Sequence, residues 1–189
     1  MRKGSQIARR GPNLEAGGSL PSIMPQTLYG SCQCGAISFT VESHTPVPYQ
    51  LCLCSICRKV AGSASGAINL CALAETLKIS PPDAASKLKK YHAIANRGKE
   101  TQKKVNSERN FCSECGTHLW VFDSNWPELI HPFAGCIDGE LPFPDQMVVL
   151  MAKDAPKWIK MPEGKKEVYE GYPPMSINDW HKKHGVWVD

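Results

Sequence analysis

The cysteines constrain this 189-residue chain more than any other feature, because seven of the nine fall into three short clusters. The clusters are Cys32-x-Cys34, Cys52-x-Cys54-x-x-Cys57 and Cys112-x-x-Cys115. Cysteines at such close spacing seldom arise from apolar packing alone, so we expect the fold to be organised around them.

The cellular compartment decides how clustered cysteines are used. No apolar run approaches the roughly 18 residues that span a bilayer, and the first residues lack the apolar core of a secretory signal. We therefore expect a cytoplasmic protein with no membrane partner. In that reducing compartment, tight cysteine clusters are more often metal ligands or catalytic thiols than disulfides.

The first and third clusters are far apart in the sequence, yet each can present two thiolates from one tight turn. Docking the two turns would form a tetrahedral four-sulfur site, which suits zinc or iron–sulfur better than a hard cation. Its ligands would be Cys32, Cys34, Cys112 and Cys115. We expect this closed site to hold zinc and to stabilise the fold, since it closes a long loop of chain.

The middle cluster differs because it supplies three thiolates within six residues and has no obvious fourth partner. Three protein ligands beside an open position are typical of a reactive zinc site. We therefore expect Cys52, Cys54 and Cys57 to hold a second zinc ion. The alternative is that Cys52 is a core residue and that Cys54 and Cys57 complete an ordinary zinc ribbon with another pair.

The remaining candidate residues carry weaker signals. Cys71 and Cys136 stand singly in apolar surroundings, so we expect buried small side chains, although either could lend a ligand to the open zinc. Among the histidines, His118 follows the third cluster and is the one to inspect. Asp138 precedes Gly139, which favours a turn residue over a general base.

The pattern of turns and short apolar runs predicts a mostly β fold with few, short helices. Fifteen glycines and fifteen prolines imply many turns. Alternating apolar residues predict a strand at residues 36–41. Further strands are expected at residues 67–72, 74–80, 91–95, 101–106, 118–122, 129–136 and 147–151. A short helix is expected over residues 176–184, with Ser176 as its cap and Asp179 three residues on.

The length favours one domain with tails over two domains. Residues 1–26 are rich in Gly, Pro, Ser and Arg without any period, which predicts a flexible tail. Residues 27–160 contain all three clusters and form the expected zinc-binding domain. Residues 161–189 are expected to be a C-terminal extension packed on that domain.

The charge identifies no partner. A net charge of +4 and a pI near 8.5 are too mild to predict nucleic-acid binding. Arg58 and Lys59 adjoin the middle cluster, and residues 87–104 are rich in lysine. These groups could receive the carboxylates of a small ligand, or they could belong to a solvated surface. The oligomeric state is not indicated.

Three motifs together resemble the glutathione-dependent formaldehyde-activating enzyme family, which also includes centromere protein V. They are GSCQCG at residues 30–35, CLCSICRKVAG at residues 52–62 and RNFCSECGT at residues 109–117. The likeness extends from about residue 29 to residue 158, since residues 134–138 and 156–158 also match the family pattern.

The resemblance implies two zinc ions per chain: a structural zinc on the first and third clusters and a catalytic zinc on the middle one. It implies a β-tent type of fold, in which small twisted antiparallel sheets join at the zinc knuckles. The implied activity is that of a zinc-dependent carbon–sulfur lyase or synthase acting on a small thiol adduct, with glutathione as co-substrate and chemistry of the S-hydroxymethylglutathione type.

One departure from the family pattern leaves alternatives open. Many members carry a histidine after the late Pro-rich turn, where this chain has Gln146 or Met147. The substrate could therefore differ, as in a zinc-dependent lyase or isomerase of specialised metabolism that does not use glutathione. A zinc-stapled binding module without catalysis, acting through residues 87–104, is a further alternative.

Overall fold

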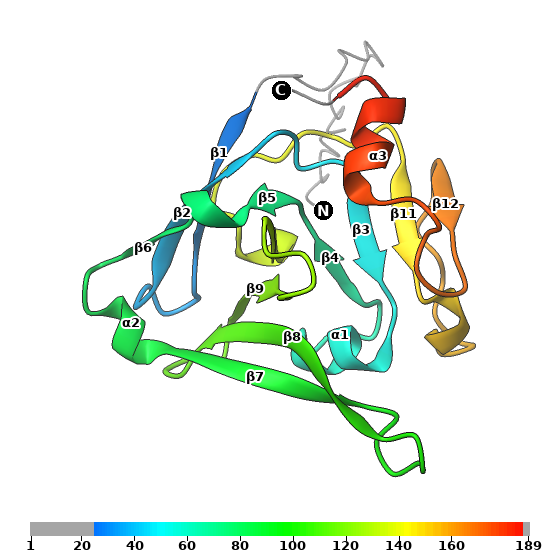
Figure 1. Ribbon diagram of the computed structural model, residues 1–189, viewed down its shortest axis with the longest axis horizontal. Helices are drawn as coiled ribbons and strands as arrows, with labels where there is room; N and C mark the ends of the chain where they lie inside the picture. Colours follow the sequence, from blue (N-terminus) through cyan, green and yellow to red (C-terminus); the bar gives the residue numbers. More distant parts are fainter. Residues whose placement is uncertain (1–24, 187–189) are drawn as a thin grey trace, which may run out of the picture.

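Short strands carry most of the fold, as expected, and they form three small sheets (Figure 1). The computed structural model describes residues 25–186. The tail expected over residues 1–26 therefore lies almost wholly outside the described residues, and the first strand begins at Gln26. Three short helices accompany the strands in this part of the chain: α1 (Ser55–Val60), α2 (Ala84–Lys87) and α3 (Ile177–Lys183).

The first sheet is antiparallel, in the order β1-β2-β6. Its strands are β1 (Gln26–Ser31), β2 (Ser38–Ser43) and β6 (Lys78–Ser80). The strand expected at residues 36–41 begins two residues later. Buried and less buried side chains alternate along it as expected, because Phe39 and Val41 are buried. The segment expected as one strand at residues 74–80 divides into a 3₁₀ turn, η1 (Ala74–Thr76), and β6.

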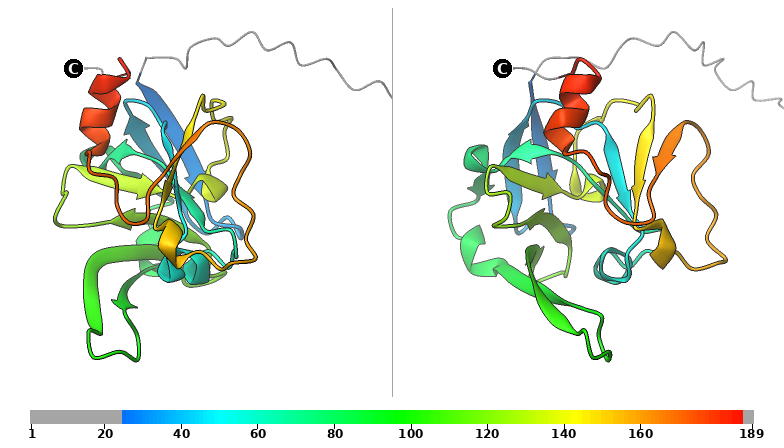
Figure 2. Two further views of the ribbon diagram at one scale, coloured as in Figure 1. Left: turned by 90° about the vertical axis from the view of Figure 1, so that its right-hand side faces the viewer. Right: turned by 45° about the vertical axis from the view of Figure 1, so that its right-hand side comes forward.

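The second sheet is also antiparallel, in the order β5-β10-β9-β8-β7. Its strands are β5 (Ala72–Leu73), β7 (Leu88–Ala95), β8 (Lys103–Cys112), β9 (His118–Phe122) and β10 (Leu129–Pro132). The β7–β8 hairpin carries the lysine-rich segment, and its far end projects from the other sheets (Figures 1 and 2). After β10 the chain makes a 3₁₀ turn, η2 (Ala134–Cys136), instead of continuing the expected strand.

The third sheet has the order β12-β11-β3-β4 and mixes directions. Its strands are β3 (Tyr49–Cys52), β4 (Ala67–Asn69), β11 (Met147–Leu150) and β12 (Lys166–Val168). β11 runs parallel to both β3 and β12, which is possible because long connections separate these strands in the chain. A further 3₁₀ turn, η3 (Ala152–Asp154), follows β11.

The strand expected at residues 67–72 is broken because the chain changes sheets there. β4 belongs to the third sheet and β5 to the second. Between them Leu70 is fully buried, and its backbone N–H donates to the carbonyl of Pro132 at 2.8 Å. This crossing joins the third sheet, in which β3 ends at Cys52, to the second sheet.

The C-terminal part of the described chain contacts the third sheet and the segment before it. α3 begins as expected, because the Ser176 hydroxyl accepts a hydrogen bond from the backbone N–H of Asp179 at 3.1 Å. The buried His181 donates from Nε2 to the carbonyl of Val47 at 2.7 Å. Over residues 25–186, no helix has the length and apolar character that crossing a membrane requires.

Candidate metal centre

Two tight turns of similar geometry hold the first and third cysteine clusters. In one turn the backbone N–H of Gly35 donates to the carbonyl of Cys32, and in the other Gly116 donates to Cys112, both at 2.9 Å. Both glycines have positive φ angles, 74° and 76°, which L-residues seldom adopt. Each glycine therefore allows the chain to fold back and present two thiols on one side.

The two turns dock so that the four predicted sulfurs lie within 4.8 Å of one another. The Sγ–Sγ distance is 3.5 Å between Cys32 and Cys34 and 3.9 Å between Cys34 and Cys112. Zinc–sulfur bonds of about 2.3 Å at tetrahedral angles separate sulfurs by about 3.8 Å, so this donor set fits zinc. A protein contact also joins the turns, since the Gln33 N–H donates to the Thr117 hydroxyl at 3.1 Å.

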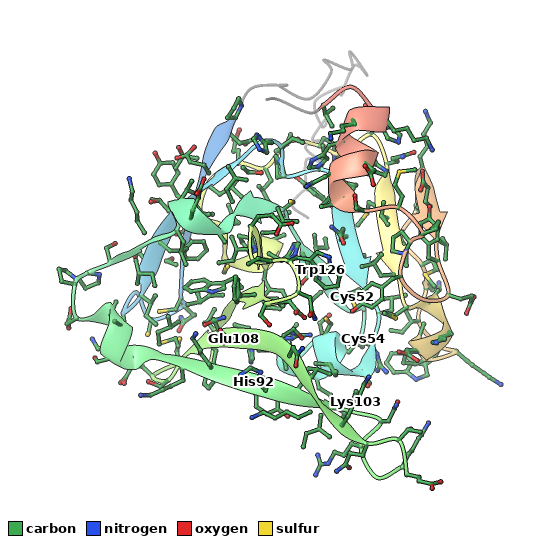
Figure 3. All side chains as sticks on the ribbon, in the orientation of Figure 1. Cys52, Cys54, His92, Lys103, Glu108 and Trp126 are labelled. Atoms are coloured by element: carbon green, nitrogen blue, oxygen red, sulfur yellow. The ribbon has the colours of Figure 1, made fainter. Side chains whose placement is uncertain are left out.

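The middle cluster forms where β3 ends and α1 begins (Figure 3). The sulfurs of Cys52, Cys54 and Cys57 lie within 4.8 Å of one another. Cys54 is the N-cap of α1, and its Sγ accepts a hydrogen bond from the backbone N–H of Cys57 at 3.3 Å. The end of β3, the N-cap and the first turn of α1 each supply one cysteine, and together they bring the three thiols close to one another.

The opposite pKa shifts of Cys52 and Cys54 indicate why this cluster suits a cation. Hydrogen bonds from Cys52 and then Cys57 lower the pKa of Cys54 below that of an ordinary thiol. The same contacts, with burial, raise the pKa of Cys52. One negative charge is therefore accommodated on Cys54, and further thiolates beside it need a compensating positive charge. Within residues 25–186, this cluster has no fourth Cys, His, Asp or Glu ligand.

Arg58 supports the middle cluster from outside. Its Nε donates to the carbonyl of Leu53 at 2.9 Å, and its Nη2 donates to the carbonyl of Asp154 at 3.2 Å. Arg58 could have received ligand carboxylates or belonged to a solvated surface, and these hydrogen bonds instead tie α1 to η3. The lysine-rich hairpin also makes ion pairs of its own, such as Lys90 with Glu108 at 2.8 Å.

The other sequence candidates belong to neither group of clustered sulfurs. Cys71 and Cys136 are buried, as expected, and burial raises the pKa of each thiol to about 12. His118 stacks on Phe111 with ring centroids 5.4 Å apart and belongs to neither cluster. Asp138 accepts a hydrogen bond from the Ser31 hydroxyl at 3.0 Å, which places it beside the first cluster.

Arg109 is a site residue that sequence reasoning missed. It lies on β8, is only 7% exposed, and is within electrostatic range of Cys57. Its Nη1 donates to the Ser107 hydroxyl at 2.8 Å, while its Nε finds no hydrogen-bond partner in the described chain. In the sequence, Arg109 opens the motif at residues 109–117, three residues before Cys112, and no role was assigned to it.

Gln146 forms a hydrogen bond with an acidic side chain of the C-terminal extension. Its Nε2 donates to Oε1 of Glu167 at 3.3 Å, and the Tyr169 hydroxyl donates to the other carboxylate oxygen at 2.5 Å. Gln146, one of the two residues considered for the position where many family members carry a histidine, is therefore an amide that binds an acidic side chain.

Comparisons with known proteins match the region that contains both clusters. A family model described as glutathione-dependent formaldehyde-activating enzyme matches residues 27–153. A curated Halomonas elongata protein, named as a candidate enzyme of that description, is 42% identical over 161 residues, covering 84% of this chain and 97% of its own. A crystal structure of a Rhodobacter sphaeroides protein gives a TM-score of 0.47 at 24% identity, covering 61% of this chain and 92% of its own.

Proposed function

Because the chain belongs to the glutathione-dependent formaldehyde-activating enzyme family, we propose that it catalyses the addition of a thiol to a small aldehyde and the reverse cleavage. In this step the thiol sulfur forms a bond to the carbonyl carbon, the carbonyl π bond breaks, and the thiol proton passes to the oxygen. The reaction needs no oxidant or reductant, and its reverse is that of a carbon–sulfur lyase. The reduced thiols that it requires suit a cytoplasmic location.

The observation that carries this proposal is the difference between the two cysteine clusters. Four sulfurs form one group and three form the other, each within 4.8 Å. We assign a structural zinc to Cys32, Cys34, Cys112 and Cys115, and a catalytic zinc to Cys52, Cys54 and Cys57. A four-sulfur set saturates a tetrahedral ion, whereas a three-sulfur set leaves one position for a substrate.

The chain's own residues have distinct roles in this scheme. Zinc bound to the middle cluster would supply the positive charge that keeps a thiol ionised at neutral pH. Cys52 and Cys57 are 7% and 4% exposed, so they restrict water on the inner side of the site. Three thiolates with a divalent ion carry one net negative charge, and the buried guanidinium of Arg109 offsets it.

The test compares Cys54→Ser with Cys71→Ser, because Cys71 is a buried cysteine outside both clusters. Zinc content is measured by mass spectrometry, and turnover by NMR exchange between glutathione, formaldehyde and their adduct. We expect Cys54→Ser to hold one zinc per chain and to lose the accelerated exchange, while Cys71→Ser keeps two zinc ions and its turnover. Full exchange by Cys54→Ser would refute the assigned catalytic site.

The contact between Gln146 and Glu167 favours a second candidate, in which the same site acts on a substrate without glutathione. A carboxylate held at this position disfavours an anionic tripeptide. Turnover of an aldehyde adduct in the absence of glutathione would support this candidate, and strict dependence on glutathione would exclude it.

A further inference from the structure

One cavity of about 580 Å³ lies between the second sheet, the third sheet and the C-terminal extension. Its walls include Gln50 of β3, Val148 of β11 and His131 of β10. Trp126, which precedes β10 and is labelled in Figure 3, also lines it. The extension closes it with residues 172–178, Trp180 and Lys183. These closing residues lie outside residues 27–153, the region that the family model matches.

The cavity borders the middle cysteine cluster. Gln50 and Cys52 are two residues apart on β3, so their side chains share one face of the sheet. Their partners on the neighbouring strand are Val148 and Leu150. Gln50 and Val148 line the cavity, and Cys52 is the next residue on the same face of β3, just beyond the lining.

Tyr172 connects the cavity to the cluster from the other side. The carbonyl of Gly171 accepts a hydrogen bond from the Met151 N–H at 3.0 Å, which fixes the extension beside the end of β11. The next residue, Tyr172, lines the cavity and lies within electrostatic range of Cys52, Cys54 and Cys57. A ligand whose sulfur reaches the cluster can therefore extend its other end into the cavity.

The wall of this cavity is aromatic, and its charge does not favour anions. Trp126, Tyr169, Tyr172 and Trp180 contribute rings. The charged lining residues are two acids, Glu128 and Glu167, and one base, Lys183, so the formal charge is −2 + 1 = −1.

His131 does not change this balance. Its Nδ1 lies 3.0 Å from the carbonyl of Leu70, which can only accept, so this nitrogen carries the proton. Burial lowers the pKa of His131, and the ring stays neutral. The lining therefore offers π faces and carboxylates, whereas glutathione would bring two carboxylates of its own.

We infer that this cavity binds an uncharged aromatic group of the substrate, so that aromatic aldehyde–thiol adducts are better substrates than S-hydroxymethylglutathione. The inference deepens the proposed function and rests on it for the position of the reacting sulfur. A cavity of this size exceeds what formaldehyde needs and matches the range of small organic ligands.

The first experiment measures cavity binding alone. The probe is 4-fluorobenzyl alcohol, which has no sulfur, titrated into the zinc-loaded full-length protein and followed by ¹⁹F NMR. Trp126→Ala, at a half-exposed site, should weaken binding about fivefold, because one ring of the wall is lost. The matched control is Trp158→Ala, whose ring is 72% exposed and outside the cavity, and which should change nothing. Equal binding by both variants would overturn the inference and would leave the proposed function standing.

The second experiment tests whether the cavity and the cluster form one site. The probe is 4-fluorobenzyl mercaptan, in which a thiol replaces the hydroxyl. It should bind at least tenfold tighter than the alcohol, and Cys54→Ser should remove that gain while alcohol binding persists. A gain that survives Cys54→Ser would show that cavity and cluster are separate. If the middle cluster of the unmutated protein binds no zinc while the alcohol still binds in the cavity, the proposed function is refuted and the cavity inference stands.

Discussion

Gly66 offers a direct way to disturb the middle cluster without touching a ligand. The residue precedes β4, has a φ of +86°, and its backbone lies against the end of β3. A Cβ at this position would stand 2.4 Å from the carbonyl oxygen of Cys52. Real Cβ contacts keep at least 3.0 Å, so Gly66→Ala requires a shift of at least 3.0 − 2.4 = 0.6 Å.

That shift exceeds what a metal site tolerates. Ligand distances in zinc sites vary by about 0.2 Å, so moving the backbone of Cys52 by three times as much should weaken metal binding at least tenfold. Gly62→Ala is the matched control, because Gly62 also has a positive φ, +60°, but its Cβ would meet nothing within 4 Å. Both variants bear a backbone cost of about 1–2 kcal/mol, and only Gly66→Ala adds a steric cost of about 1–3 kcal/mol.

The assay is zinc retention against a competing chelator, with unfolding in urea as the measure of stability. We expect Gly62→Ala to keep two zinc ions and Gly66→Ala to keep one at the same chelator concentration. Equal retention by the two variants would refute the reasoning that the Cys52 backbone positions the second ion.

Three further predictions concern stability. Cys112→Ser should lower the free energy of unfolding by several kcal/mol through loss of the structural ion, whereas Cys136→Ser should cost much less, because a hydroxyl can still donate to the carbonyls that Cys136 contacts. Ser176→Ala should cost about 1 kcal/mol in urea unfolding through loss of the α3 cap. Burial lowers the pKa of His181 in the folded protein. As the pH falls, this histidine therefore takes up a proton in the unfolded chain before it does so in the folded one. Stability should therefore be full above about pH 6.5 and fall below it, and His181→Gln should fall less steeply; parallel pH profiles would contradict this assignment.

The cysteine groups could be predicted from the sequence because their geometry is largely local. The spacing Cys52-x-Cys54-x-x-Cys57 commits three thiols to one turn, whatever surrounds them. The docking of the first and third clusters was also expected, since each pair alone would leave a half-filled site. The short strands and the Ser176 cap likewise depend on neighbours in the sequence.

The features that were missed depend on contacts across the fold. The parallel pairing of β11 with β3 brings Leu150 beside Cys52, and no local pattern indicates it. The sequence assigned no role to Arg109, because nothing local indicates that its strand, β8, lies between β7 and β9 and that its side chain is buried. The cavity is the plainest case, because Trp126 and Tyr172 meet around it from parts of the chain far apart in sequence.

The proposed function requires that the two cysteine clusters hold two zinc ions in different coordination, one saturated and one open to a thiol. Cadmium NMR on protein reconstituted with ¹¹³Cd, before and after addition of a thiol, tests it most directly. Two resonances are expected, of which only one shifts when the thiol is added, and Cys54→Ser should remove that resonance. A single resonance, or two resonances that do not shift when the thiol is added, would contradict the proposed difference in coordination.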